Sequence, residues 1–554
     1  MMHWLLFAYH RGGRLFVRLI INRLCEINNG YKIKPYMKKI ILIVISFLAL
    51  YFAAHAQPVS VRVLSNEQTF GTNIISNTDI NGVLYTFPQR IHDFFLDTTT
   101  GYISLQLRNL SRNGKYLDNN GKLVQFDPQT SKVIWSMEMY YASNYIQHFN
   151  NNLITGFGGK STGLDLNTGN KLWTIKNGIM MANSAADIGI GYRYKGSSGY
   201  TNDLRGIDMR TGAVKWERFL EHDYGWNEAF YINDSTLIVA SSGLHAVNLR
   251  TGRGWDYHAL TGKKDYTGMV AANAAGLALG FLTGTFVVTT GHDVVTDLVS
   301  NTLIDNDYIY FATREEIVKL NKNTGELAWQ YPIPKDMGSQ SALYLDDNSV
   351  YMINKGLGNL GNRKVKIGEP FVAAFNRETG VQEYFSFIKE KELQIISHEV
   401  INDQIFLLFA NRIMVCSMAD GQKLVTKDFN LGNKIGFEYF TGSNIFIERE
   451  NKVLALFELW PENLFVVTTD GKVLSINSQL EIEETIEKDE LMFYHNQYSG
   501  YKLISKADKC SVIDEAGNRV AELKATPGAI VNGDLLYDKA EKALIVVDLR
   551  EVGK

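Results

Sequence analysis

Short runs of apolar residues alternate with polar turns along most of the chain, and no long stretch has the 3.6-residue period of a helix. Residues 164–173, "LDLNTGNKLW", show the pattern most clearly. Asp165 has a short side chain that can accept backbone N–H groups and nucleate a tight turn. Gly169 suits a position with positive φ. The unit therefore predicts a strand, a tight turn and a second strand that carries Trp173.

This unit is repeated. Close copies occur at 207–216 ("IDMRTGAVKW"), 247–255 ("VNLRTGRGW") and 320–329 ("LNKNTGELAW"), with related copies at 126–135, 375–384 and 416–425 and degenerate ones near Asn477 and Asp514. Most of the turns are 38 to 60 residues apart, which leaves room for four short strands. Four antiparallel strands repeated at this period predict an all-β fold: a single β-propeller of four-stranded blades, about eight in number within a range of seven to ten.

The large aromatic residue of each copy has a structural explanation in such a fold. Blades stack face to face, and a bulky ring near the outer hairpin fills the wedge between neighbours. The predicted structural residues are Trp135, Trp173, Trp216, Trp255 and Trp329, together with the turn residues Asp165, Gly169, Asp208, Gly212, Gly252 and Gly325.

A propeller must also join its two ends. The C-terminal stretch "ALIVVDL" reads as a strand with no outer strand after its turn. Near the other end, Val59, Val61 and Val63 alternate with polar residues. We therefore expect residues 57–66 to complete the last blade and to remove two open sheet edges.

The N-terminal region predicts export. Residues 37–56 contain a basic start (Lys38, Lys39), a 13-residue apolar core and the small-x-small sequence "AHA", as in a secretory signal peptide cleaved before Gln57. A membrane anchor is the alternative, although the apolar core is short for a span. We interpret Met37 as the true first residue of the protein and residues 1–36 as the result of a start codon assigned too far upstream. Residues 1–56 hold eight of the 56 Lys and Arg residues and one of the 59 Asp and Glu residues, so residues 57–554 have a formal charge of −10. This charge argues against nucleic-acid partners.

Two segments interrupt the repeat. An apolar insertion covers about residues 256–291, and its part at 269–288 is almost free of charge and long enough to consider as a membrane segment. The alternative is a buried, small-residue segment packed on the propeller, and Asn273 together with the glycines favours it. The second segment, 354–370, is rich in Gly and Asn and carries Arg363, Lys364 and Lys366. We expect a mobile surface loop, and a docking site formed by its positive charge on an acidic protein is the less favoured interpretation.

Three cysteines are present, and Cys25 precedes the predicted cleavage site. Cys416 and Cys510 differ in their spacing from the nearest turn, which places them on opposite sheet faces and predicts two buried free thiols. Motifs for zinc proteases, redox dithiols, nucleophile elbows and phosphate loops do not occur in the sequence. The histidines lack the spacing of metal ligands, so no metal site is predicted.

The turn units resemble those of the pyrroloquinoline-quinone-like β-propeller repeat family. The residues that carry the resemblance are Asp165-Thr168-Gly169-Trp173, Asp208-Thr211-Gly212-Trp216 and Asn321-Thr324-Gly325-Trp329. This family includes quinone- and calcium-dependent dehydrogenases of alcohols and sugars as well as non-enzymatic scaffolds. The adjacent cysteine pair of the alcohol dehydrogenases is missing here, as is a C-x-x-C-H haem site. The resemblance therefore favours the scaffold branch, with no cofactor expected, and leaves a pyrroloquinoline-quinone and calcium enzyme as the alternative.

The return loops between repeats gather on one face of a propeller and supply candidate binding residues. They are Tyr140 and Tyr141 in the loop 139–145, Asp223, Tyr224, Trp226 and Asn227 in 221–228, and Asp336, Ser339 and Gln340 in 334–341. These side chains either form an exposed aromatic rim or fold inward. The hypothesis is an exported, non-catalytic binding protein, periplasmic or extracellular, whose partner is an envelope or secreted protein, a peptide or a glycan.

Overall fold

The computed structural model describes residues 61–554 except 150–151, 184–185, 265–293, 362, 390–393, 430–434, 441–443, 469 and 507–508. The predicted upstream segment 1–36, the signal peptide 37–56 and the apolar stretch 269–288 lie outside these residues. The described residues form nine four-stranded antiparallel sheets and one 11-stranded sheet. The predicted all-β chain of four-stranded antiparallel sheets is therefore confirmed.

Eight of the four-stranded sheets follow the order of the repeats. Their strands are β3 (Arg90–Leu96), β4 (Ile103–Leu110), β5 (Leu117–Asp127) and β6 (Lys132–Tyr140); β7 (Asn144–Phe149), β8 (Asn152–Phe157), β9 (Lys160–Leu164) and β10 (Lys171–Ile175); β11 (Met181–Asn183), β12 (Ile188–Tyr194), β13 (Tyr200–Asp208) and β14 (Val214–Phe219); β15 (Glu228–Asn233), β16 (Thr236–Ala240), β17 (Gly243–Asn248) and β18 (Asp256–His258); β21 (Leu303–Ile304), β22 (Tyr308–Ala312), β23 (Glu316–Asn321) and β24 (Leu327–Pro332); β25 (Ser341–Leu345), β26 (Ser349–Asn354), β29 (Phe371–Asn376) and β30 (Gln382–Phe387); β31 (Ser397–Ile401), β32 (Gln404–Leu408), β33 (Arg412–Ser417) and β34 (Lys423–Asp428); and β35 (Ile435–Phe440), β38 (Leu464–Thr468), β39 (Val473–Ile476) and β40 (Ile482–Ile486).

The ninth four-stranded sheet combines two insertions. It consists of β19 (Lys263–Lys264), β20 (Val294–Thr296), β27 (Leu357–Leu360) and β28 (Arg363–Lys366). The 11-stranded sheet contains β1 (Leu64–Asn73), β2 (Thr78–Thr86), β36 (Ile445–Arg449), β37 (Lys452–Ala455), β41 (Met492–Tyr498), β42 (Tyr501–Lys506), β43 (Lys509–Ile513), β44 (Arg519–Leu523), β45 (Ile530–Asn532), β46 (Leu535–Ala540) and β47 (Ala543–Asp548). The described helical turns are η3 (Gly196–Ser198) and α3 (Leu456–Leu459).

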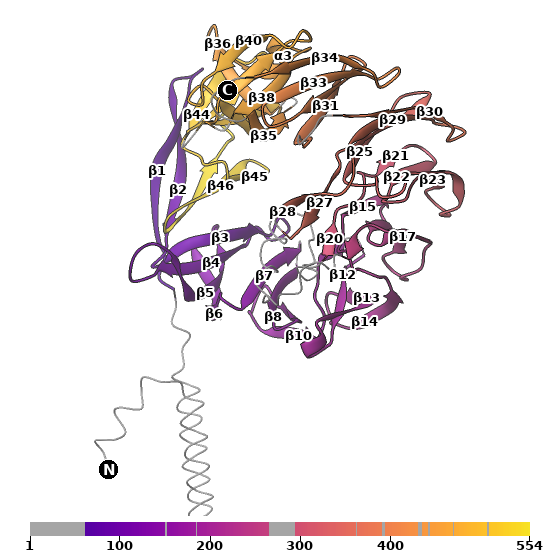
Figure 1. Ribbon diagram of the computed structural model, residues 1–554. Coiled ribbons are helices and arrows are strands. Elements are labelled where there is room, and N and C mark those ends of the chain that lie inside the picture. The colour runs from indigo at the N-terminus through magenta and orange to yellow at the C-terminus, as the bar shows by residue number, and fades with distance from the viewer. Residues whose placement is uncertain are drawn as a thin grey trace, which may run out of the picture. The chain divides into compact units, whose positions relative to one another are not determined.

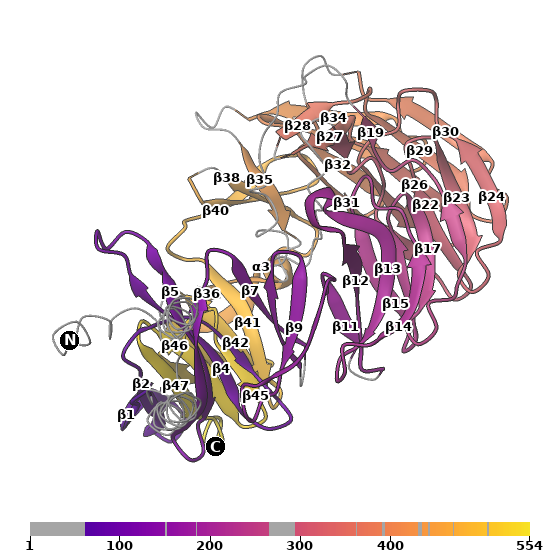
Figure 2. The same cartoon turned by 90° about the horizontal axis from the view of Figure 1, so that it is seen from below.

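The N-terminal and C-terminal strands of the described chain lie side by side. Strand β2 pairs with β47, with Leu84 opposite Ile545, and β1 pairs with β44. In Figures 1 and 2 the indigo strands β1 and β2 accordingly lie beside the yellow C-terminal strands. The prediction that residues 57–66 supply the strand beside β47 is wrong, because that strand is β2. A Cβ atom at Gly82 would lie 2.8 Å from the carbonyl oxygen of Val546, so the close approach of β2 needs this glycine.

Each turn unit is built as its sequence predicts. Asp165 accepts hydrogen bonds at Oδ1 from the backbone N–H groups of Asn167 and Thr168, at 2.9 and 2.8 Å. Gly169 has a φ of 70° and donates its N–H to the carbonyl of Asp165 at 2.8 Å. Asp208 and Gly212 form the same turn in the next repeat.

The tryptophan of one repeat bonds to the turn of the next. Trp173 donates its indole N–H to the carbonyl oxygen of Met209 at 2.8 Å, and its ring occupies the space where a Cβ atom of Gly212 would lie. The same bond joins Trp135 to Leu166, Trp216 to Leu249, Trp255 to Lys322 and Trp329 to Arg377, and hydroxyl groups replace the indole where Tyr384 bonds to Met418 and Tyr85 to Pro128. We call this contact the inter-repeat latch. It explains why Thr-Gly and a tryptophan recur together.

Buried apolar side chains continue the contact between successive sheets. Ile154 and Trp173 of the sheet β7–β10, for example, pack with Ile207 and Met209 of the sheet β11–β14. Equivalent clusters follow along the chain, and one of them joins Leu544 of β47 to residues of the sheet β3–β6. Cys416 and Cys510 are buried and free, as predicted, and burial raises the pKa of both thiols.

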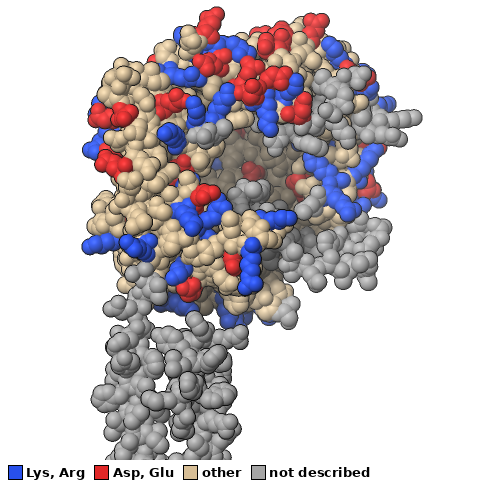
Figure 3. Space-filling view, turned by 90° about the vertical axis from the view of Figure 1, so that its left-hand side faces the viewer, with Lys and Arg blue, Asp and Glu red and all other residues tan. Residues whose placement is uncertain are grey.

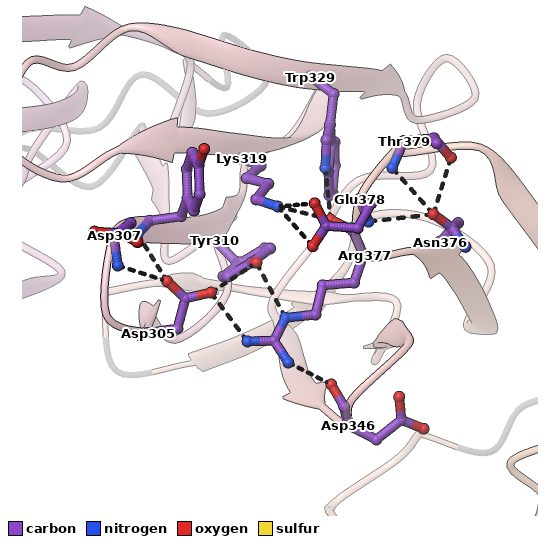
Figure 4. A network of polar contacts seen from close by, with 11 residues as sticks. Asp305, Asp307, Tyr310, Lys319, Trp329, Asp346, Asn376, Arg377, Glu378 and Thr379 are labelled. Carbon is purple, nitrogen blue, oxygen red and sulfur yellow. Dashed lines mark hydrogen bonds and ion pairs between the residues drawn. The ribbon is translucent and has the colours of Figure 1, made fainter.

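A charged network reinforces the latch between the sheets that contain β22 and β29 (Figure 4). Arg377 donates to Asp305 Oδ2 at 3.0 Å, to the Tyr310 hydroxyl at 3.2 Å and to the carbonyl of Asp346 at 2.7 Å. Lys319, only 2% exposed, donates to the carbonyl of Arg377 at 3.0 Å. Although burial opposes it, the hydrogen bonds that Asp305 accepts from backbone N–H groups and from Arg377 lower the pKa of its carboxyl group to about 2.

The latch predicts that Trp173→Phe destabilises the protein. The carbonyl of Met209 would lose its hydrogen-bond donor, and a smaller phenyl ring would replace the buried indole. The free energy of unfolding should therefore fall by about 2–3 kcal/mol. Urea denaturation measures this change. Leu172→Ala is the control, since Leu172 is 51% exposed and its truncation should cost about 0.5 kcal/mol or less. Equal losses in the two variants would contradict the latch.

The network predicts an acid-dependent loss in Asp305→Asn. The folded pKa of Asp305 lies below its unfolded value, so its stabilisation is present above about pH 4 and is lost as the pH falls towards 2. The variant should therefore lose about 1–2 kcal/mol at pH 7 and much less at pH 2.5, as measured by urea denaturation. Asp307→Asn, at an exposed neighbouring carboxylate, should change stability little at either pH. A pH-independent loss in D305N would refute the role of the charge.

Candidate functional site

The two segments that interrupt the repeat meet in one small sheet, which we call the insertion sheet (β19, β20, β27 and β28). Val295 of β20 pairs with Lys263 of β19 on one side and with Leu360 of β27 on the other. The insertion after β18 and the Gly-rich segment after β26 are thus partners, although more than 60 residues separate them in the sequence. The sheet is short, and its strand order places β19 and β28 at its two edges.

Backbone hydrogen bonds attach the insertion sheet and its flanking residues to the return loop 334–341 and to the β22–β23 turn. Gln340 donates its N–H to the carbonyl of Leu357 at 2.8 Å and accepts from the N–H of Lys355 at 2.9 Å. Arg314 donates its N–H to the carbonyl of Leu260 at 3.2 Å. The ring of Tyr224 lies where a Cβ atom of Gly262 would be, so the loop 221–228 also contacts this assembly.

A half-buried polar cluster lies at the insertion sheet, around Asp297. The Asp297 carboxylate accepts hydrogen bonds from the side-chain amides of Gln340 and, at 3.1 Å, Asn359. Burial raises its pKa to about 6, against the opposing effect of Lys355 and Lys364. Burial also lowers the pKa of the Lys355 ammonium group. Burial therefore makes the charged form of each group less favourable than the charged form of an exposed Asp or Lys residue.

The cluster continues towards β31. Burial, followed by the charge of Lys355, lowers the pKa of His398 to about 3, and burial raises the pKa of Glu399 to about 7. The ring of His398 packs edge-on against Tyr344, with 5.9 Å between centroids. The sequence analysis did not predict this cluster. The signal that could have indicated it is a charged residue inside an apolar stretch, as in "VVTDLVS".

The surface of the insertion sheet is basic. Arg363, Lys364 and Lys366 are exposed on β28, and Lys263 is exposed on β19 at the opposite edge. Among these, Lys366 pairs with Glu369 at 2.7 Å. Elsewhere the balance differs: Figure 3 shows Asp and Glu gathered at the upper edge of its view, where Figure 1 places β36, β40 and α3. Positive charge on an acidic chain suits an acidic partner surface.

Of the candidate residues in 334–341, two hold the loop in place. Ser339 is 1% exposed, donates to Asn354 Oδ1 at 2.5 Å and accepts from the N–H of Gly356 at 2.8 Å. Gln340 bonds to Asp297, as described above. Asp336 is exposed and accepts from Arg314 at 3.1 Å, so of these three it offers the most surface to a partner.

In 221–228, Trp226 follows the second of the two alternatives and folds inward. Its ring is 4% exposed and donates to the Tyr192 hydroxyl at 2.8 Å, because a large apolar ring gains more by filling the core between β12 and β16. Asn227 is half-buried and donates its N–H to the carbonyl of Ala240 at 2.8 Å. Asp223 and Tyr224 are partly exposed, and their role in binding stays a prediction.

Of the remaining pair, Tyr140 is the last residue of the outer strand β6, and Tyr141 is the first residue of the loop after it. Tyr140 is 49% exposed. Tyr141 donates its hydroxyl to the carbonyl of Lys122 at 2.9 Å and packs beneath Arg108, and burial raises its pKa. The described contacts do not connect these two residues with the insertion sheet, whereas they do connect 221–228 and 334–341.

Residues 111–275 match the family model described as outer membrane protein assembly factor BamB. The predicted resemblance to pyrroloquinoline-quinone-like repeats is thereby confirmed. No curated protein sequence matches the chain. Within the part of the chain that the structure describes, no helix has the length and apolar character needed to cross a membrane, and no three His, Cys, Asp or Glu side chains are grouped to hold a metal ion.

Several solved structures are similar to the chain. BamB from Moraxella catarrhalis shares 14% identity, with 64% of this chain and 92% of that one covered and a TM-score of 0.31. The dihydro-heme d1 dehydrogenase NirN in complex with DHE shares 9%, with coverages of 73% and 76% and a TM-score of 0.31. A eukaryotic initiation factor shares 9%, with 82% and 98% covered and a TM-score of 0.32. With TM-scores below 0.5, these similarities carry no argument about function.

The raised pKa of Asp297 in the half-buried cluster predicts that Asp297→Asn stabilises the protein near neutral pH. Since the folded pKa of Asp297 is raised, its protonated form contributes stability below about pH 4, and this contribution is lost as the pH rises through 6. Asparagine stays neutral and tolerates the φ of 63° at this position. D297N should gain about 1–2 kcal/mol over the wild type at pH 7.5 and almost nothing at pH 4, by urea denaturation.

Asp336→Asn is the matched control for D297N, because Asp336 also has a positive φ, 60°, but is exposed. Its stability relative to the wild type should change by less than about 1 kcal/mol, with no trend between the two pH values. A loss of stability in D297N at pH 7.5 would show that the Asp297 carboxylate is needed in its charged form.

Proposed function

We propose that this chain is a non-catalytic β-propeller of the bacterial cell envelope, exported to the periplasm or beyond, that binds another protein through its insertion sheet. In this proposal the four-stranded sheets are the blades of one closed ring. Eight blades come from the four-stranded sheets that follow the repeats, and two more come from β41–β44 and from β45–β47 with β2. Ten blades stand at the upper end of the range predicted from the sequence, above the preferred value of eight.

The observation that carries the proposal is the exposed basic surface of the insertion sheet. The segments that form the sheet are fixed by backbone hydrogen bonds to Gln340 of one return loop and to Arg314 of the β22–β23 turn, so the cations of the sheet are held on a rigid support. Its exposed Arg363, Lys364 and Lys366 contrast with the acidic composition of residues 57–554. Lysine on an edge strand also discourages pairing with other strands, which fits docking by side chains. The match of residues 111–275 to the BamB family model supports a scaffold in the envelope.

The proposal predicts that reversing three charges abolishes partner capture. A photo-crosslinking residue at position 260, where Leu260 is 39% exposed, should give discrete crosslinked products in intact cells of the source bacterium. Arg363→Glu, Lys364→Glu and Lys366→Glu together should remove these products and lower the affinity for the partner at least tenfold, and the wild-type affinity should fall with rising salt.

The matched control reverses three exposed lysines outside the insertion sheet: Lys115→Glu, Lys132→Glu and Lys524→Glu. It carries the same change in net charge and should keep the crosslinked products. Equal loss in both triple variants would indicate a general effect of charge, not a docking site. Saturable binding of pyrroloquinoline quinone with calcium, followed by dye reduction with alcohols or sugars, would contradict the proposal and establish a dehydrogenase.

A further inference from the structure

A second basic feature lies away from the insertion sheet, between the second and third repeat sheets. A pocket of about 460 Å³ opens there, lined by Ile175 and Lys176 at the end of β10, by Arg193, Tyr194, Lys195 and Gly196 at the end of β12, and by Arg205 and Val214. The N–H of Tyr194 donates to the carbonyl of Lys176 at 3.1 Å, so a backbone hydrogen bond joins the two walls. The pocket is therefore built on a fixed contact between sheets.

The charge of this pocket is positive. Two of its four cations have carboxylate partners: Arg205 bonds to Glu217 at 2.6 Å, and Arg193 lies 3.7 Å from Asp203. Lys176 and Lys195 are exposed and form no ion pair with any residue that the structure describes. Because the chain as a whole carries a net negative charge, two uncompensated lysines at one pocket indicate an anionic ligand.

The pocket also has an apolar side. Val214 is 43% exposed and Ile175 is half-buried. The ring of Tyr194 lies over Gly159, where a Cβ atom would come within 2.1 Å of it, and its centroid is 5.3 Å from that of Tyr200. These contacts hold the ring in one place. A ligand that uses both sides must carry anionic groups next to aliphatic ones.

One wall of the pocket is an open sheet edge. In the order β10-β9-β8-β7, β10 is the last strand, and it pairs only with β9 among the described residues. Its outer backbone N–H and C=O groups are therefore available to a further strand. An extended peptide can pair with such an edge while its alternate side chains enter the neighbouring pocket.

We propose that this pocket binds an extended acidic peptide segment of a partner, which adds as a strand to β10. Carboxylates of the peptide pair with Lys176 and Lys195, and an aliphatic side chain two residues away from each carboxylate, on the same face of the added strand, packs on Val214 and Tyr194. This site goes beyond the proposed function, because it is separate from the insertion sheet and recognises a different kind of ligand. Loss of one site leaves the other intact.

The test uses the purified full chain and a fluorescein-labelled eight-residue peptide, Glu-Ser-Val-Ser-Glu-Ser-Val-Ser, which places Glu and Val on the same face of an extended strand. Fluorescence anisotropy should show saturable binding that weakens as salt is added. The double variant Lys176→Glu, Lys195→Glu should bind at least tenfold more weakly, whereas Lys176→Arg, Lys195→Arg should stay within about threefold of the wild type. Lys115→Glu, Lys132→Glu makes the same change in charge elsewhere and should bind like the wild type.

Two further ligands separate peptide recognition from general anion binding. The same peptide with alternate backbone amides N-methylated keeps its charge but loses donors for strand pairing, so it should bind at least tenfold more weakly. A sulfated oligosaccharide should fail to displace the peptide at equal ionic strength. Absence of peptide binding, equal binding by the double glutamate variant, equal binding of the methylated peptide, or displacement by the oligosaccharide would each overturn the proposal. None of these outcomes bears on crosslinking at the insertion sheet.

Discussion

The bond from the aromatic residue of one repeat to the turn carbonyl of the next is the contact on which the rest of the structure depends. A four-stranded sheet with two apolar faces cannot stand alone in water, so each sheet must find a neighbour at a defined distance and angle. The latch sets both, because the tryptophan ring fits the space above a glycine that has no Cβ atom. Where an aromatic hydroxyl replaces the indole, at Tyr384 and Tyr85, the bond to the turn carbonyl is kept.

The regular order of the sheets explains where insertions can be placed and what they can do. Antiparallel strands alternate in direction, so the return loops and the connections between second and third strands emerge at the same end of each sheet. The segments 259–296 and 355–370 are inserted at this end, in neighbouring repeats, and for that reason they can pair. Their sheet carries exposed cations and borders a half-buried carboxylate, Asp297, a charge arrangement that the repeats themselves do not need for stability.

Much of the fold could be predicted because its signals are local. The Asp-x-x-Thr-Gly turn and the tryptophan three or four residues later specify each hairpin, and counting copies gives the repeat. Pairing between distant segments could not be predicted in this way. Residues 57–66 and 78–86 both alternate as strands do, and only the close approach allowed by Gly82 distinguishes β2 as the partner of β47. Whether Trp226 faces water or the core likewise depends on Tyr192 of another strand. The Asp297 cluster also depends on residues from three separate segments.

The N-terminal strand β2 completes the last sheet of the series by pairing with β47. The most direct measurement is spontaneous disulfide formation between cysteines placed at Val83 and Val546, which face each other across β2 and β47 and are both partly exposed. The account predicts that Val83→Cys, Val546→Cys oxidises in air to a cross-linked monomer, seen by mass spectrometry and by non-reducing electrophoresis. The control, Leu84→Cys with Val546→Cys, places the two thiols on opposite faces and should stay reduced. If the first pair also remains reduced in the folded protein, β2 does not complete the last sheet and the account is wrong.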